Sequence, residues 1–546
     1  MIRKIKIMWL AMFALCVTSC KLDLLDNPNE VTTSNTNINY LLNRIQLNYS
    51  DFFNSTSNTG MRLTRMLNQG SALYENAYAP SGGDGLWTNS YANILIDIQT
   101  LIPLAESSNL HMHAGIARLL RGYVLATLVD YYGDVPLSEA LNSSNFNPGV
   151  DPATSVYAAA MKDVDDAIAN FAATSAAAPA DYFYAGNADS WTRAAKTIKL
   201  KLLFTKRLTD NTVAAAINTL IAEDKLIKNG TQNFAFKFGT LLSNPDSRHP
   251  RYRDQYLPTG GGDYQANFYI WHLYSGKGFP DPRIRYYMYR QTLTNTTTTN
   301  ELSCINNQKP AHYANDMVYC VPTSVGYWGR DHLSNEGIPP DGLRRTAWGL
   351  YPIGGLYDND AGRPVTQGGG AGGAGIHPIM MSSFVDFMLA ESALTINTTG
   401  APRALLESGI RKSMADVRSF ATATIENASI TAFETNKAIV WSQEVEKYVT
   451  KVLELYDAAA TNDAKLDVIA REYWLALYGN GIEAYNMYRR TGKPSKMQPA
   501  LEVNPGAFVR SLYYPAAVVN RNNAVVQKPS IAQPVFWDNN PATLTF

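Results

Sequence analysis

Charged residues are scarce in this chain of 546 residues, at 17% of the total, and neither sign is in excess. The 47 Lys and Arg residues match the 47 Asp and Glu residues. A nucleic-acid partner calls for a surplus of positive charge, so this balance argues against DNA or RNA as the main partner. The 32 Tyr and 9 Trp residues instead offer aromatic faces to a neutral polar ligand, and sugars are such ligands.

Long hydrophobic runs are also missing, which excludes a lasting transmembrane helix of about 20 apolar residues. The apolar stretch at residues 7–17 is shorter and follows Arg3, Lys4 and Lys6, as in a secretory signal. Residues 17–20, Val-Thr-Ser-Cys, resemble a bacterial lipobox, in which the cysteine is acylated and becomes the mature N-terminus. We therefore predict a lipid anchor at Cys20; the alternative is an ordinary cleavage site next to an incidental cysteine.

Cysteines number only four, and Cys16 leaves with the signal while Cys20 is assigned to lipid. Cys304 and Cys320 remain, and in an oxidising compartment they could form a disulfide or stay as two buried thiols. No C-x-x-C pair with a nearby His pair completes a zinc site, so we predict no metal.

Catalytic signatures are absent as well. The sequence has no G-x-S-x-G and no H-E-x-x-H, and its glycine-rich run at 367–375 lacks the G-K-[ST] ending of a phosphate loop. Asp331 and Glu336 are the nearest candidates for a pair of glycosidase carboxylates. We predict a protein without enzymatic activity and without a cofactor, and we keep an envelope hydrolase as an alternative.

Helical periodicity is what the sequence has in abundance. Apolar residues recur at three- and four-residue spacing over 38–53, 86–107, 113–133, 151–171, 190–208, 382–394, 401–420 and 464–492. Gly133 is a stop signal, Asp151 and Pro152 are expected as N-cap and first helical residue, and residues 479–481 split the last unit. Helix pairs of about 34 residues resemble tetratricopeptide repeats, with generic helical hairpins as the alternative.

The periodicity is lost between about 240 and 378, where Pro, Gly, Asn and aromatic residues crowd together. Such a long irregular stretch is functional or disordered, and its aromatic content favours function. We predict a mainly α protein: a tetratricopeptide-like helical-repeat scaffold with a large irregular, loop-rich ligand-binding excursion. The expected segments are a signal (1–19), a flexible tether (20–37), scaffold (38–240), excursion (241–378), scaffold (379–495) and an irregular end (496–546).

Aromatic side chains in the excursion are the candidate ligand contacts, because Tyr and Trp combine a rigid face with a polar group. Single rings could equally pack the loops onto the scaffold, but as a group they favour contact with a ligand. The predicted site residues are Trp328, Trp348, Tyr327, Tyr351, Arg330, Asp331, Tyr264 and Trp271.

Several motifs together resemble the SusD/RagB-like nutrient-binding outer-membrane lipoproteins. They are the lipobox Cys20, "LWTNSYANILIDIQTLI", "ARLLRGYVLATLVDYYGDVPLSEAL" and "REYWLALYGNGIEAYNMYRRTGKPS" followed by "LYYPAAVVNRNN". The segment "GYWGRDHLSNEGIPPDGLRRTAWGLYPIGGLYD" looks like the SusD-like 2 branch.

This resemblance implies a lipid-anchored protein on the outer face of the outer membrane. It would bind nutrient oligosaccharides or polysaccharides and pass them to a SusC-like TonB-dependent barrel. Capture of peptides by the same scaffold and a pure protein-interaction scaffold are the alternatives. Ligand residues vary within the family, so the resemblance assigns none here.

Overall fold

The computed structural model describes residues 37–336 and 339–540, and most of their regular structure is helical. The predicted anchor at Cys20 lies outside the described residues. In the first half the helices are α2 (Ile38–Leu63), α3 (Tyr74–Ala77), α4 (Asp84–Thr88), α5 (Ile96–Ser107), α6 (His111–Tyr132), α7 (Ala153–Ala172), α8 (Ala188–Thr205) and α9 (Val213–Ala222). A π-helical stretch, Asn89–Leu95, joins α4 to α5.

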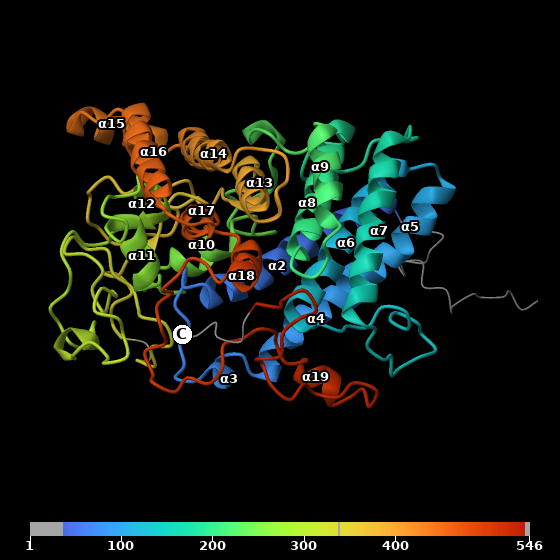
Figure 1. The fold of residues 1–546 in the computed structure, drawn as a ribbon, viewed down its shortest axis with the longest axis horizontal. Helices are drawn as coiled ribbons and strands as arrows, with labels where there is room; N and C mark the ends of the chain where they lie inside the picture. The colour runs from blue at the N-terminus through green and yellow to red at the C-terminus, as the bar shows by residue number, and fades with distance from the viewer. Residues whose placement is uncertain (1–36, 337–338, 541–546) are drawn as a thin grey trace, which may run out of the picture.

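The second half adds α13 (Ser382–Ile396), α14 (Pro402–Thr422), α15 (Asn427–Lys437), α16 (Trp441–Ala458), α17 (Asn462–Ala476), α18 (Gly481–Thr491) and the short α19 (Ala516–Val519). Figure 1 shows α5 to α9 on the right, α2 in the centre and α13 to α16 along the top, with the green and yellow loops of the excursion on the left. Successive helices pack as antiparallel neighbours, most extensively α6 on α7 and α13 on α14.

Local signals explain where several helices begin and end. Gly133 ends α6 as predicted. Its φ of 79° is a backbone conformation that glycine adopts without strain, and its N–H donates a hydrogen bond to the carbonyl of Val129 at 2.8 Å. The side chain of Asn480 accepts a hydrogen bond from the N–H of Glu483 and so caps α18.

The predicted start of α7 is wrong by one residue, because Pro152 is the N-cap and not the first helical residue. The helix begins at Ala153, and its first N–H donates to Asp134 Oδ1 at 2.7 Å. Asp151 instead accepts hydrogen bonds from the N–H groups of Leu137 and Ser138, at 2.7 and 2.9 Å, because the chain before α7 folds back on this loop.

A small sheet marks both ends of the excursion. Strand β1 (Phe234–Lys237) pairs antiparallel with β4 (Ile376–Met380), with Phe234 opposite Met380 and Lys237 opposite Ile376. Between them lie α10 (Pro250–Gln255), α11 (Asn267–Tyr274), α12 (Ile284–Tyr287) and the paired strands β2 (Met288–Tyr289) and β3 (Ala347–Trp348). The mainly α fold with a loop-rich excursion is confirmed.

The helical scaffold closes on itself across the sequence. Ser57 Oγ in α2 donates to the carbonyl of Gly479 and accepts from the N–H of Gly481, both at 2.8 Å. After α18 the chain returns over the scaffold and buries Trp537 completely. Cys304 and Cys320 form a disulfide, with their Cα atoms 5.6 Å apart.

Candidate ligand-binding groove

Two adjoining hollows share the side chain of Arg62, at the end of α2. The first has a volume of about 330 Å³ and includes Asn68, Ser71, Asp263, Tyr264, Arg330, Ser334, Asn335 and Glu336. The second, of about 430 Å³, includes Ser55, Asn58, Thr59, Gln69, Tyr78, Gly83, Gly85, Tyr132 and Tyr513. We call the two hollows together the groove. The second hollow also includes Ala77 of α3 and Leu86 of α4, two helices that Figure 1 shows below α2.

Asp263 joins the scaffold to the excursion in the wall of the first hollow. One carboxylate oxygen accepts from Arg62 of α2 and the other from Arg251 of α10. Arg251 also donates to Asn58 Oδ1 at 2.6 Å, back on α2. Burial alone would raise the pKa of Asp263, but Arg251 and Arg62 outweigh it and hold that pKa below its usual value.

Tyr264 is the aromatic ring of the first hollow. Its hydroxyl donates to Asp341 Oδ1 at 2.7 Å, and its carbonyl accepts from the N–H of Asn68 at 2.9 Å. The guanidinium carbons of Arg345 and Arg330 lie 3.7 and 4.5 Å from the ring centroid. These contacts fix the ring, so it is presented to the hollow in one orientation.

The segment that leads into Cys304 supports one wall of the first hollow. Glu336 accepts from the N–H of Ser303 at 3.0 Å with one oxygen, and its other oxygen lies 3.0 Å from Arg330 Nε. Arg330 also donates to the carbonyl of Glu301 at 2.9 Å and to Asp341 Oδ2 at 2.6 Å. Two residues of the lining, Glu336 and Arg330, are therefore held in place by residues 301–303, directly before Cys304.

Polar atoms without a hydrogen-bond partner among the described residues gather in this lining. They are Arg62 Nε, Asn68 Oδ1, Tyr78 Oη and Tyr132 Oη. A buried polar group without a partner costs stability, and native structures keep few of them. All four atoms are buried and belong to residues that line the groove.

The lining offers binding chemistry. Tyrosines, amides and hydroxyls dominate, and its described residues include no His and no Cys. The described residues of the whole chain contain no group of three or more His, Cys, Asp or Glu side chains placed to hold a metal.

The structure separates the two carboxylates that were candidates for hydrolysis. Glu336 lines the groove, but Asp331 is buried and accepts hydrogen bonds from the N–H of Cys320 at 2.8 Å and Gln498 Nε2 at 2.7 Å. Burial raises the pKa of Asp331. Asp331 is not part of the lining, so the two carboxylates do not flank one hollow.

Of the eight predicted ligand residues, Tyr264 and Arg330 line the groove. Trp271 is half-buried beside His272 and lies outside both hollows. The other five are buried: Trp328, Trp348, Tyr327, Tyr351 and Asp331. An aromatic ring without exposed surface cannot stack on a ligand in this conformation.

The buried rings have clear structural partners. Trp348 lies between the ring of Tyr478, at 4.5 Å, and the guanidinium of Arg251, at 4.8 Å. Tyr351 packs on Tyr287 at 5.6 Å, and Trp328 joins a small cluster with Leu302 and Cys320. These buried rings therefore lie behind the side chains that line the groove.

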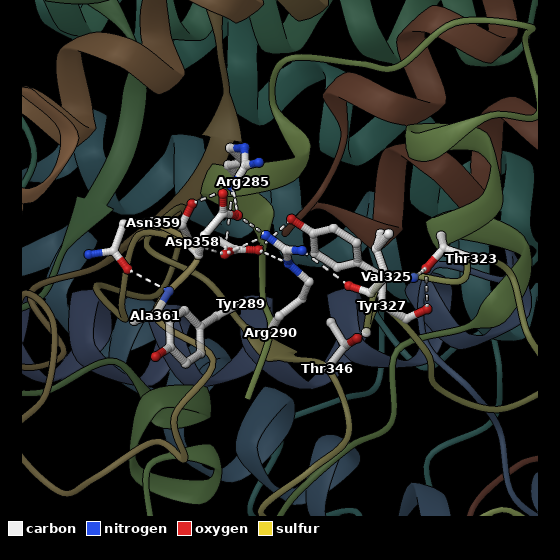
Figure 2. A network of polar contacts seen from close by, with 12 residues as sticks. Arg285, Tyr289, Arg290, Thr323, Val325, Tyr327, Thr346, Asp358, Asn359 and Ala361 are labelled. Atoms are coloured by element: carbon white, nitrogen blue, oxygen red, sulfur yellow. Dashed lines mark hydrogen bonds and ion pairs between the residues drawn. The ribbon is translucent and has the colours of Figure 1, made fainter. Parts of the chain in front are cut away.

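Tyr327 belongs to a network of polar contacts shown in Figure 2. Its hydroxyl donates to Asp358, and its ring lies 4.6 Å from the guanidinium of Arg290, which also pairs with Asp358. This network ties the loop at 323–327 to the segment at 358–361.

Sequence reasoning missed every residue of the second hollow, including Tyr78, Tyr132 and Tyr513. Residues 68–85 carried a usable signal: "NQGSALYENAYAPSGGDG" has the same mixture of Gly, Asn, Ser and Tyr as the excursion. Tyr132 lies inside a periodic helix and gave no such signal.

Comparison with known proteins agrees with this architecture. Residues 28–318 match the SusD-like 2 family, described as starch-binding and associating with the outer membrane, and residues 376–535 match the family of SusD and RagB outer membrane lipoproteins. No curated protein sequence matches the chain. None of the helices in the described part of the chain is long and apolar enough to cross a membrane.

Solved structures with the same fold include a SusD homologue from Bacteroides fragilis, at 19% identity and a TM-score of 0.65, over 93% of this chain and all of the other. A SusD/RagB family protein from Bacteroides thetaiotaomicron has 16% identity and a TM-score of 0.65, over 93% and all. A chitin-binding SusD homologue from Flavobacterium johnsoniae has 16% identity and a TM-score of 0.61, over 92% and all. The chain therefore belongs to the SusD/RagB-like family, in its SusD-like 2 branch.

Proposed function

We propose that this protein binds nutrient oligosaccharides in the groove and is not an enzyme. The observation that carries the proposal is the lining: tyrosines, amides and hydroxyls in both hollows, with buried polar atoms that lack partners among the described residues. Sugars present hydroxyls for such groups and C–H faces for rings. The chitin-binding name of one structural relative supports a glycan ligand.

Delivery to a SusC-like TonB-dependent barrel completes the proposal, with the protein held at the cell surface by lipid on Cys20. The description of the family as outer-membrane lipoproteins supports this location. A carrier has to release its cargo, so a dissociation constant in the range of about 1 μM to 1 mM would suffice. Replacing Cys20 with Ser should move the protein from the membrane fraction to the soluble fraction of the envelope.

Calorimetry against panels of oligosaccharides and peptides tests the binding. One variant for each hollow, Tyr264→Ala and Tyr513→Ala, should lower glycan affinity by about tenfold, which corresponds to about 1.4 kcal/mol. Tyr40→Ala is the matched control, because Tyr40 lies on α2 outside both hollows and is 74% exposed. Its affinity should equal that of the unchanged protein.

Three results would overturn the proposal. Binding of peptides alone would assign the scaffold to peptide capture. Release of products from a bound glycan would make the protein a hydrolase. Equal affinity in all three variants would place the ligand elsewhere.

A further inference from the structure

The charges of the groove lining cancel in pairs. Its charged side chains, among the described residues, are Arg62, Asp263, Arg330 and Glu336. Arg62 is paired with Asp263, and Arg330 Nε lies 3.0 Å from Glu336. Each guanidinium that could attract an anionic ligand therefore already faces a carboxylate.

The layer behind the lining repeats this arrangement. Arg251 binds the second oxygen of Asp263, and Asp341 binds Arg330. Arg345 lies under Tyr264 and donates to the carbonyls of Gly261 and Gly262, at 2.6 and 3.1 Å. Burial and the nearby charge of Asp263 raise the pKa of Asp254, against the opposing charges of Arg253 and Arg251.

Asp263 is the central element of this pattern, because one carboxylate holds two guanidiniums. Its side chain is 21% exposed, that of Arg62 is 29% exposed and that of Arg251 is 8% exposed. In such a partly desolvated place a further charge on the ligand would have to displace an existing pair or remain unpaired. A neutral hydroxyl can hydrogen-bond to the same groups without disturbing the pairs.

We infer that Asp263 masks Arg62 and Arg251 and makes the groove selective for uncharged glycans over uronate-containing or sulfated ones. This rests on the proposed function and names the substrate class of the same groove. The mask works by negative charge: the amide of an Asn at this position could accept one hydrogen bond but would neutralise neither guanidinium.

The test uses a matched pair of probes, trigalacturonate and its methyl ester, which share a backbone and differ in charge. Calorimetry of the full chain in detergent should show that the unchanged protein does not favour the acid. Asp263→Asn should bind the acid at least about tenfold more tightly than the ester, since two guanidiniums lose their counter-charge. That preference should disappear between about 50 mM and about 500 mM NaCl, because salt screens exposed charges.

Two control variants separate the mask from a general change in charge. Arg62→Gln leaves Asp263 paired with Arg251 and should create no preference for the acid. Asp457→Asn releases Arg403 on the surface between α14 and α16, away from the groove, and should also create none. If Asp263→Asn does not fold, the double variant Asp263→Asn/Arg251→Gln carries the test, because it also removes the more buried guanidinium and leaves only Arg62 without its counter-charge.

A preference for the acid in the unchanged protein would overturn the inference. So would a folded Asp263→Asn variant that binds the acid no better than the ester. Failure of the proposed function looks different: no neutral glycan of the panel binds the unchanged protein, whatever Asp263→Asn does with the charged probe.

Discussion

Asp416 on α14 illustrates how strongly one half-buried side chain can respond to pH. Its Oδ1 accepts from Asn233 Nδ2 at 3.0 Å, and its Oδ2 has no hydrogen-bond partner among the described residues. Burial raises the pKa of Asp416 to about 7, against the opposing effects of the Asn233 hydrogen bond and the charge of Lys412. The folded protein therefore holds this proton more tightly than the unfolded chain does.

We predict that Asp416→Asn stabilises the protein at neutral and alkaline pH but not at acid pH. With a folded pKa above the unfolded value, the contribution of Asp416 is present at about pH 4 and is lost as the pH rises through about 7. Urea unfolding from pH 4 to pH 8 should show a gain that grows to about 1–3 kcal/mol. A gain independent of pH would contradict the assignment.

Asp457→Asn provides a control of opposite sign. Hydrogen bonds from Arg403 hold the pKa of Asp457 below its usual value. Its contribution is therefore present above the unfolded pKa, so this variant should lose stability at neutral pH and none at acid pH.

Single residues were also where sequence reasoning was least able to identify the site. A Tyr or Trp in an aromatic loop suits a core and a binding surface equally, and only tertiary packing decides between them. Trp348 was a reasonable candidate until Tyr478, 130 residues later, was found to cover it. Likewise nothing in the helix pattern of α2 indicates that Arg62 pairs with Asp263, 201 residues away.

At the scale of elements, the crossing of α2 and α18 depends on two glycines. A Cβ on Gly60 would lie 2.0 Å from the carbonyl oxygen of Gly481, and one on Gly481 would lie 2.0 Å from that of Ser57. The two backbones are in direct contact, so neither can yield by changing a rotamer. Small residues are required at this point of the scaffold.

We predict that Gly60→Ala lowers the free energy of unfolding by about 1–3 kcal/mol or more, as overpacking does. Denaturant unfolding should compare it with Gly85→Ala in α4, where a Cβ meets nothing within 4 Å. The control should be neutral or stabilising by up to about 1 kcal/mol, because Ala restricts the unfolded chain more than Gly. If Gly60→Ala and Gly85→Ala changed the free energy of unfolding equally, α2 and α18 could move apart at their crossing without cost, and the prediction would be wrong.

The disulfide-closed loop is a second element whose loss should be local. Replacing both Cys304 and Cys320 with Ser removes a cross-link that typically contributes about 2–4 kcal/mol. We expect the variant to be cleaved by proteases between these positions while the helical scaffold stays intact. Mass spectrometry of the fragments checks this, and cleavage spread over the whole chain would contradict it.

Helices were the most predictable elements, because amphipathic periodicity and end signals are local. The paired helices α13 and α14 and the break before α18 lie where the sequence places them. The start of α7 differs because Asp151 serves the loop before it, a contact set by the return of the chain. The positions of β1 and β4, whose residues pair across some 140 positions, carried no comparable local signal.

At the scale of the whole molecule, the C-terminal segment is part of the core. Trp537 is fully buried, its Nε1 donates to Asp130 Oδ1 of α6 at 2.8 Å, and the guanidinium of Arg489 lies 4.7 Å from its ring. Arg510 pairs with the neighbouring Asp538. One ring thus joins α6, α18 and the end of the chain.

We predict that Trp537→Ala destabilises the whole protein by about 3–5 kcal/mol, through the cavity left by the ring. The unpaired Asp130 oxygen adds to that cost. Val526→Ala, at a residue of the same segment that is 81% exposed, should change stability by less than about 0.5 kcal/mol. Thermal unfolding of both variants measures the difference. A small effect of Trp537→Ala would show that the C-terminal segment lies on the surface of the scaffold and does not contribute to its core.

The contact between Ser57 and residues 479–481 has a consequence for the order of folding during synthesis. Ribosomes deliver the chain from its N-terminus, and domains generally fold in that order. Here α2 meets α18, the helix with which it makes its most extensive contact, only when almost the entire chain has emerged. The early helices can pack on one another during synthesis, as α2 does on α5 and α6, but the scaffold cannot close until residues 479–481 have emerged.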